Sequence, residues 1–257
     1  MIQKITSATN PLIKELRALA TSKKARRENN RFILEGWRGI KTLFEHPSES
    51  FKIIHLIITP NWENDHRLPS TLPTTQLPEA LFSKISDVKN AQGILAIIQH
   101  HPTPFCFNPT AGKYLLVDQL RDPGNLGTLI RSAVGSQFDG ILLHGNCVDP
   151  FNPKTIRASM GTFAHLTLSP ISSTELTQMQ AADYTLYATT GSNGSNIYST
   201  PFPPKLILAI GSEAHGLCET ILQTADEKIT IPLAPTCESL NAAIAGSICM
   251  FQINHLN

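Results

Sequence analysis

Three clusters of small and polar residues follow apolar, strand-like runs in the second half of the chain. They are Asn125–Gly127, with Arg131 four residues beyond the glycine; Gly211–Glu213, with Gly216 close behind; and Glu238–Asn241. Proteins place Gly, Asn and Ser at strand ends where a ligand must approach bare backbone. We therefore expect the three clusters to converge on one shared pocket.

The polar side chains of these clusters are a guanidinium, a carboxylate, amides and a hydroxyl. Arg131 follows the first cluster at a spacing that projects it near the start of a helix, close to any group held by the loop. Glu213 lies in a loop or first helical turn, where a carboxylate is favoured. Ser239 could instead be only a helix N-cap. The glycine pattern GxGxxG is missing after the first strand, which argues against a nicotinamide-dependent oxidoreductase.

The elements that must position these residues read as an α/β domain. Apolar strands are predicted at 114–117, 141–143, 184–188 and 206–210, with a further strand around 229–231 and a last helix over 242–255. Strands that are apolar throughout are buried on both faces, as in a parallel sheet with helices on either side.

The first hundred residues predict a smaller, mixed α/β unit. A basic amphipathic helix is expected from Pro11 toward Ala25, helices over 36–45 and 79–85, strands at 32–34, 51–59 and 93–99, and a loop over 60–78. Three prolines and no periodicity between 100 and 112 indicate a linker. We place the domains at 1–100 and 113–257, with the linker at 101–112.

Charge is distributed unevenly along the chain. Residues 1–41 hold ten Lys or Arg against three acids, so this segment carries +7 and the remaining residues −6 of the net +1. Such an asymmetry is typical of an electrostatic footprint for a polyanion, although a solvated helix face is the alternative. The residues expected to contact such a polyanion are Lys23, Lys24, Arg26, Arg27, Arg31 and Arg38.

Composition excludes several other classes. The chain has 257 residues, 41% hydrophobic and 16% charged, as expected of a globular protein with a real core. It shows no signal-peptide pattern and no membrane span, so a cytoplasmic protein is expected. Its five cysteines are widely spaced and form no CxxC pair, which predicts neither disulfides nor a bound metal.

Taken in order, the motifs resemble those of a known family. Asn-x-Gly-x-x-x-Arg (125–131), Gly-Ser-Glu-x-x-Gly-Leu (211–217), and Ile-Pro-Leu followed by Glu-Ser-Leu-Asn (231–241) resemble the three motifs of the SpoU (TrmH-like) branch of the SPOUT RNA methyltransferases. Residues 152–161 look like that family's middle segment. The N-terminal part looks like the ribosomal-L30e-like substrate-binding domain that often precedes this catalytic domain.

This resemblance implies a parallel sheet tied in a deep trefoil knot, a homodimer, and methyl transfer from S-adenosylmethionine to a ribose 2′-hydroxyl of RNA, with ribosomal RNA favoured over transfer RNA. By analogy, the cofactor contacts Thr189, Thr190, Gly211, Gly216, Ile231 and Leu240.

The resemblance also assigns catalytic residues. Arg131 is central, either as a base or as an electrostatic clamp; a guanidinium is a poor proton acceptor because it is almost always charged, which favours the clamp. Asn125, Ser239 and Asn241 would orient the ribose, and Glu213 would hold Arg131 or a substrate hydroxyl. The alternative function is a non-catalytic RNA-binding or ribosome-assembly factor on the same fold. Ala214 and Pro235 stand where relatives commonly have Gly, so these loops could be stiffer and cofactor affinity could differ.

Overall fold

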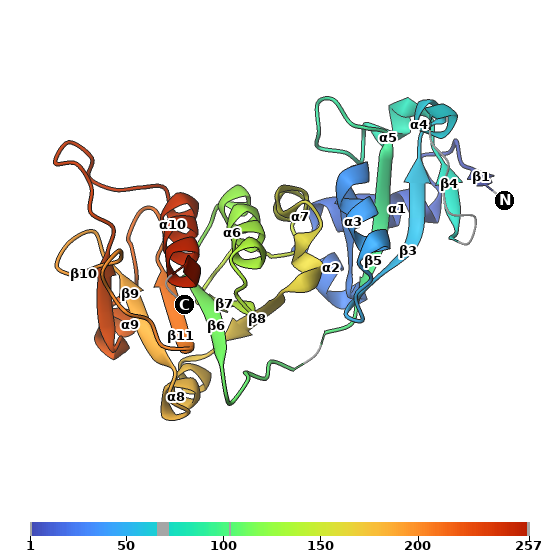
Figure 1. The fold of residues 1–257 in the computed structure, drawn as a ribbon. Helices are drawn as coiled ribbons and strands as arrows, with labels where there is room; N and C mark the ends of the chain where they lie inside the picture. The colour runs from blue at the N-terminus through green and yellow to red at the C-terminus, as the bar shows by residue number, and fades with distance from the viewer. Residues whose placement is uncertain (1, 66–71, 103, 256–257) are drawn as a thin grey trace. The chain divides into compact units, whose positions relative to one another are not determined.

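The structure is a computed structural model that describes residues 2–65, 72–102 and 104–255 (Figure 1). The chain divides into two compact units. Unit 1 comprises Met1–Thr103 and Phe151–Ala164, and unit 2 comprises Pro104–Pro150 and His165–Asn257.

Unit 1 is a mixed sheet covered by short helices. Its described strands run in the order β1-β4-β3-β5-β2; β5 is antiparallel to both β2 and β3, and the other pairs are parallel. Its elements are β1 (Ile2–Lys4), α1 (Pro11–Thr21), α2 (Lys23–Asn29), β2 (Arg31–Glu35), α3 (Trp37–Glu45), β3 (Phe51–Ile58), α4 (Pro60–Asp65), β4 (Thr74–Gln76), α5 (Glu79–Phe82), β5 (Ile94–His100) and α7 (Pro153–Ser159).

The helix predicted from Pro11 toward Ala25 is two helices. Asn10 caps α1 by accepting a hydrogen bond from the Leu12 N–H, and Pro11 occupies the first turn, where its missing N–H costs nothing. Ser22 then adopts an extended conformation and accepts a hydrogen bond from the Ala25 N–H, which starts α2. The prediction of one continuous helix was wrong because the capping capacity of Ser22 outweighs the helical periodicity.

The predicted loop over 60–78 also contains regular structure. It includes α4 and the short parallel strand β4, which pairs with β1 and β3. Residues 66–71 of this stretch lie outside the described residues.

Unit 2 is an α/β domain built on a parallel sheet. Its described strands run in the order β10-β12-β9-β11-β6-β7-β8, and every pair is parallel. The elements are β6 (Gly112–Asp118), α6 (Pro123–Gly135), β7 (Gly140–His144), β8 (Thr167–Ile171), α8 (Ser173–Ala181), β9 (Thr185–Thr189), β10 (Ser195–Asn196), β11 (Lys205–Ile210), α9 (Glu219–Thr224), β12 (Glu227–Thr230) and α10 (Ala242–His255).

Helices cover both faces of this sheet, as the apolar strands predicted. Ala209 of β11 belongs to a core cluster with Met179 of α8 and Ile221 of α9. The next residue, Ile210, points the other way, toward α10, which packs on α6 (Figure 1). Because neighbouring strand residues face opposite sides, the two helix layers lie on opposite faces of the sheet.

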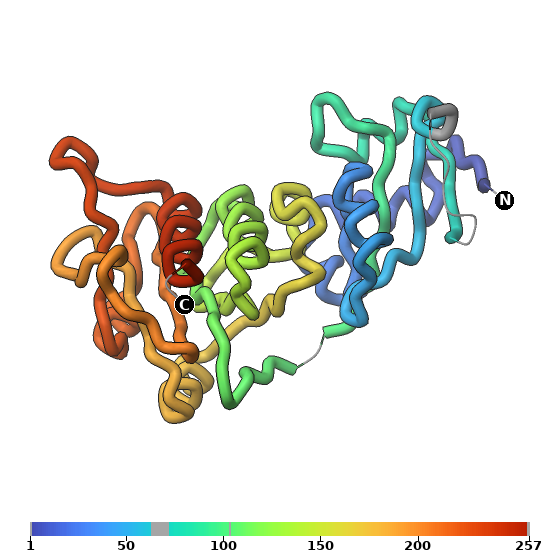
Figure 2. Tube along the Cα trace, viewed as in Figure 1, coloured from blue at the N-terminus to red at the C-terminus, as the bar shows by residue number. Residues whose placement is uncertain are grey.

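The chain crosses between the units three times. After β7 it contributes Phe151–Ala164, including α7, to unit 1 and then returns to β8; Figure 2 follows this path along the Cα trace. The described residues between 101 and 111 have no regular secondary structure, whereas Gly112, the last residue of the predicted linker, begins β6. Phe105 and Phe107 nevertheless pack against the core of unit 2. Tyr184 also donates a hydrogen bond to the Asn108 carbonyl, so this part of the linker is fixed to unit 2. No described helix is long and apolar enough to cross a membrane.

Candidate active site

A cavity of about 240 Å³ opens at the carboxyl ends of β9, β11 and β12 and at the start of α10. We call it the strand-end cavity. In a parallel sheet this edge is the usual place for a ligand. All six residues predicted to contact a cofactor line it. The lining residues are Thr189, Thr190, Gly191, Ile210, Gly211, Ser212, Glu213, Gly216, Ile229, Ile231, Leu233, Glu238, Ser239, Leu240, Ala242, Ala245 and Cys249.

The loop after β11 closes tightly on itself. Ser212 and Gly216 exchange backbone hydrogen bonds of 3.0 and 2.9 Å. A Cβ on Gly211 would lie 2.0 Å from the Gly216 carbonyl carbon, and Gly216 has a φ of +67°. Only glycine at both positions allows this turn, which leaves backbone groups exposed to the cavity.

The threonine hydroxyls of the cavity are bound to the protein. Thr189 Oγ1 donates to the Ala209 carbonyl at 2.8 Å, and Thr190 Oγ1 lies 3.2 Å from Thr230 Oγ1. These bonds tie β9 to its two neighbouring strands. The cavity wall there is therefore a rigid surface of methyl groups and backbone, suited to a flat, largely apolar ligand part.

The third motif forms the start of α10. Asn241 Oδ1 accepts hydrogen bonds from the N–H groups of Ala243 and Ile244, at 2.9 and 3.2 Å. Asn241 is therefore the residue that caps this helix. Ser239, for which capping was the alternative role, is instead exposed at the cavity.

Three predicted catalytic residues form one hydrogen-bonded chain at the edge of the cavity. Asn125 Nδ2 donates to Glu213 Oε1, and Asn241 Nδ2 donates to Asn125 Oδ1 at 3.1 Å. Asp122 fixes the first turn of α6 by accepting a hydrogen bond from the Asn125 N–H at 2.8 Å. Segments more than eighty residues apart in sequence thus meet through Asn125.

Arg131 stands apart from this chain. It lies exposed on α6 and is not among the residues that line the strand-end cavity. Within the described part of the protein no ion pair joins it to Glu213, which accepts a hydrogen bond from Asn125 instead. The guanidinium is therefore available for an anionic partner from outside the unit.

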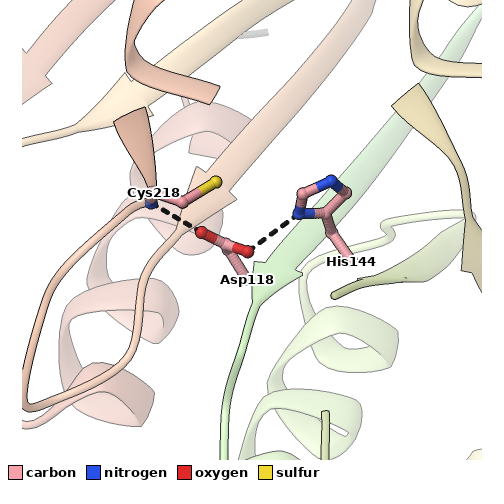
Figure 3. A group of neighbouring side chains, drawn as sticks. All are labelled: Asp118, His144 and Cys218. Carbon is pink, nitrogen blue, oxygen red and sulfur yellow. Dashed lines mark hydrogen bonds and ion pairs between the residues drawn. The ribbon is translucent and has the colours of Figure 1, made fainter. Parts of the chain in front are cut away.

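Asp118, at the end of β6, holds the loop of the second motif in place through hydrogen bonds (Figure 3). Its carboxylate is buried and accepts two hydrogen bonds, from the Cys218 N–H at 2.7 Å and from His144 Nδ1 at 2.8 Å. This carboxylate thereby fixes the end of the 211–218 loop to β6 and β7. Sequence reasoning missed this role, although Asp118 is the first polar residue after an apolar strand.

The same three residues are the group that could hold a metal ion among the described part of the chain, with ligand atoms within 4.8 Å of one another. Two observations disfavour a metal there. Both Asp118 oxygens are used in hydrogen bonds, and burial raises the pKa of the Cys218 thiol, which opposes the thiolate that a metal needs. Burial also raises the pKa of Cys249, inside the strand-end cavity, to about 12.

The basic N-terminal residues divide into exposed and structural ones. Lys23, Lys24, Arg27 and Arg38 are exposed, and Arg31 pairs with Glu15 at 2.8 Å. Arg26, however, is only 5% exposed, and its Nη1 donates to the Leu19 carbonyl at 2.6 Å. This guanidinium binds the carboxyl end of α1, which argues against the predicted contact of Arg26 with RNA.

With this geometry established, comparisons with known proteins give a consistent result. Residues 112–251 match the SpoU rRNA Methylase family, and residues 10–96 match an MRM3-like substrate binding domain.

Full-length relatives agree with these matches. The chain is 32% identical over 260 residues to a 23S rRNA (guanosine(2553)-2′-O)-methyltransferase of Bacillus subtilis, covering 98% of this chain and 99% of the relative. It is 25% identical to a 23S rRNA (uridine(2479)-2′-O)-methyltransferase of Streptomyces viridochromogenes, covering 97% and 91%. The crystal structure of an AdoMet-bound rRNA methyltransferase from Sinorhizobium meliloti superposes with a TM-score of 0.85 at 29% identity, covering 99% and 98%.

Proposed function

The chain belongs to the SpoU rRNA methylase family, and from this premise we propose that it transfers a methyl group from S-adenosylmethionine to a ribose 2′-hydroxyl of ribosomal RNA. One observation carries the proposal: the strand-end cavity, with all six predicted cofactor residues, adjoins the chain of Asn125, Glu213 and Asn241. We further propose that it meets this RNA in the cytoplasm.

The residues of the cavity fit S-adenosylmethionine. The glycine turn at 211–216 offers backbone groups for the polar edge of an adenine and for ribose hydroxyls, and the side chains of Ile231 and Leu240 offer apolar contact for the ring faces. Bound there, the cofactor supplies an electrophilic methyl group on a positively charged sulfur. No metal is needed for this chemistry.

The chain's own residues must then position and activate the ribose. The amides of Asn125 and Asn241 and the hydroxyl of Ser239 can hold the substrate oxygens by hydrogen bonds. Arg131 acts as an electrostatic clamp on the substrate phosphate and on the negative charge that develops at the 2′-oxygen. Arg131 does not accept the proton of the 2′-hydroxyl, because a guanidinium remains protonated at physiological pH. That proton passes to solvent water as the bond from the 2′-oxygen to the methyl group forms.

Glu213 supports this arrangement through Asn125. By accepting a hydrogen bond from Asn125 Nδ2, its carboxylate orients the amide so that Asn125 Oδ1 faces Asn241. The role of Glu213 is therefore to order the asparagine pair rather than to hold Arg131.

A second copy of the chain completes the site. On α10, Ile244 and Phe251 are 53% and 51% exposed and lie seven residues apart, on one face of the helix. This apolar face adjoins α6, which carries the unpaired Arg131. Joining two such faces would bury the apolar residues and bring each Arg131 to the edge of the partner's site.

Light scattering tests the dimer. We expect the wild-type protein to be a dimer and Phe251→Glu to be a monomer, because a buried, unpaired carboxylate opposes association. Tyr198→Glu is the matched control: Tyr198 is also 51% exposed, but it follows β10, at the edge of the sheet. A dimer that survives Phe251→Glu would place the interface elsewhere.

The knot expected for this family is part of the proposal. It is supported by the position of β11 between β9 and β6 and by the packing of α10 on both α6 and β11. Stretching the chain between residues 112 and 255 would test it: a knotted chain stops short of the full contour length of about 3.3–3.6 Å per residue.

Transfer of a radioactive methyl group to ribosomal RNA tests the activity and the role of Arg131. We expect Arg131→Ala and Arg131→Lys both to lower kcat, by about 10²–10³ for alanine, while cofactor affinity measured by calorimetry stays unchanged. Near-full activity in Arg131→Lys would contradict a planar, bidentate clamp. Cofactor and RNA binding without turnover in the wild type would favour the non-catalytic alternative.

A further inference from the structure

Unit 1 contains a second cavity, of about 320 Å³, where β2 ends and α3 begins. We call it the Glu35 pocket. Its other walls come from the segment before β5 and from the end of α7. The lining residues are Leu34, Glu35, Gly36, Arg38, Gly39, Val88, Asn90, Gln92, Arg157 and Met160.

A buried carboxylate with unused acceptor capacity lies in this pocket. The Glu35 side chain is only 7% exposed. Its Oε1 accepts a hydrogen bond from Ser86 Oγ at 2.6 Å, whereas Oε2 has Arg157 Nη1 at 4.0 Å, too far for a hydrogen bond. Burial raises the pKa of Glu35. A carboxylate held in such a place without full pairing costs stability, which a ligand's N–H groups could restore.

The polar groups around Glu35 are held in place by other contacts. Arg157 is fixed by Asp87, with Nη1 at 2.5 Å and Nη2 at 3.4 Å from the two carboxylate oxygens. Gln92 Oε1 accepts a hydrogen bond from the Trp37 N–H at 2.9 Å, which fixes the plane of that amide. Rigid donors beside a rigid acceptor are suited to reading a planar ligand edge.

The remaining walls are apolar or bare. Leu34, Val88 and Met160 supply hydrophobic contact. Gly36, with φ of +98°, has no side chain, and the position where its Cβ would lie has a single close neighbour, a Gln92 oxygen at 3.5 Å. A cavity lined by both apolar side chains and a carboxylate matches a nucleobase, which has apolar faces and a polar edge.

We propose that the Glu35 pocket binds an unpaired guanine of the RNA substrate, at a nucleotide other than the one methylated. The proposal rests on the proposed function, since that function supplies RNA as the ligand. It gives the substrate-binding unit a means of selecting a site by sequence, which exposed lysines and arginines on phosphates do not provide.

Guanine fits better than the other bases because of its hydrogen-bonding edge. Its N1–H and N2–H donors lie side by side and can both reach the Glu35 carboxylate, while its O6 accepts from Arg157 or Gln92. Uracil would place carbonyl oxygens against the carboxylate, and adenine and cytosine offer only one amino group beside an acceptor nitrogen. The exposed Arg38 can contact the phosphate of the bound nucleotide.

Selection from a pool of random RNA dodecamers, with the full chain as bait, tests this inference. We expect the wild type to enrich guanine at one position, and Glu35→Gln to lose that preference by about tenfold. Glu45→Gln is the matched control: Glu45 is exposed at the end of α3 in unit 1 and pairs with Lys41 at 3.5 Å. This control should enrich guanine like the wild type.

Two results would overturn the inference: guanine preference retained in Glu35→Gln, or wild-type enrichment of another base or of none. A cross-linking experiment covers the case in which Glu35→Gln fails to fold. Wild-type protein should cross-link to RNA carrying 6-thioguanosine within residues 88–92 or 157–160, and attachment elsewhere contradicts the pocket.

Methylation assays on the same proteins separate this inference from the proposed function. Methyl transfer by a wild-type protein without guanine preference would reject the pocket and leave the function standing. Guanine preference without methyl transfer would support the pocket and reject the proposed function.

Discussion

The strand-end cavity of unit 2 and the Glu35 pocket of unit 1 are built from different groups. Backbone, methyl groups and short side chains line the first, and its acidic residues Glu213 and Glu238 are exposed. Charged and amide side chains line the second, around a buried carboxylate. The first is suited to the cofactor S-adenosylmethionine, and the second to the hydrogen-bonding edge of a base.

The largest expected effect comes from filling the backbone turn of the strand-end cavity. We expect Gly211→Ala to abolish cofactor binding and to lower the free energy of unfolding by about 2–4 kcal/mol. The added Cβ would lie 2.0 Å from Gly216 C and 2.2 Å from Leu217 N, and backbone atoms cannot rotate away. Urea unfolding and calorimetry measure the two effects.

Gly191→Ala is the control for that change. Gly191 lines the same cavity, but its Cβ would meet no protein atom within 4 Å, so its free energy of unfolding should change by less than about 0.5 kcal/mol. Equal losses in the two variants would mean that backbone crowding does not shape the cavity.

Sequence reasoning reached these two cavities to different degrees. The strand-end cavity was predictable because many of its lining residues belong to the second and third motifs, and the family resemblance added Thr189 and Thr190. The partners within the site were not: nothing in the sequence pairs Glu213 with Asn125 rather than with Arg131.

No comparable sequence motif predicted the Glu35 pocket. Glu35, Gln92 and Arg157 come from three separate segments, and Arg157 reaches unit 1 only because the chain returns there between β7 and β8. The burial of Arg26 was likewise not predictable, because a basic run gives no indication of which side chain turns back onto the preceding helix.

The next effect concerns the anchor behind the second motif. Asp118→Asn presents an NH₂ group to either the Cys218 N–H or His144 Nδ1, so we expect a loss of about 1–3 kcal/mol in unfolding free energy and weaker cofactor binding. Asp183→Asn, at a side chain that is 92% exposed, should be neutral.

A chelator should leave the wild-type melting temperature unchanged; a lowered melting temperature would mean that Asp118, His144 and Cys218 hold a metal.

A smaller effect concerns the stability of unit 1, which should depend on pH. Burial lowers the pKa of His100 to about 4, from an ordinary value of 6.5; its ring stacks on Phe51 with centroids 4.8 Å apart. The neutral ring therefore contributes stability that is complete above pH 6.5 and is lost as pH falls from 6.5 through 4. We expect unit 1 to lose about 1–2 kcal/mol over this range.

Hydrogen exchange followed by mass spectrometry resolves the two units. Exchange in β3 and β5 should accelerate at pH 4 in the wild type and much less in His100→Phe, which keeps the stacked ring. His215→Gln, at an exposed position of unit 2, should behave like the wild type. Equal acceleration in His100→Phe would assign the acid sensitivity to another group.

The smallest effect tests whether Glu35 is kept for binding at a cost to stability. Because burial raises its pKa, its favourable contribution exists below pH 4.5 and is lost as pH rises through the folded-state pKa. Glu35→Gln retains an acceptor for Ser86, so at pH 7 it should raise the unfolding free energy by about 0.5 kcal/mol, and this gain should vanish toward pH 4.

Glu45→Gln, which removes an exposed pair with Lys41, should instead be neutral or slightly destabilising, and salt should erase its effect. A loss of stability in Glu35→Gln would mean that the carboxylate stabilises the fold through its interaction with Arg157. A gain combined with lost guanine preference would mean that unit 1 retains a strained charge for recognition, whereas the strand-end cavity achieves its fit through backbone shape.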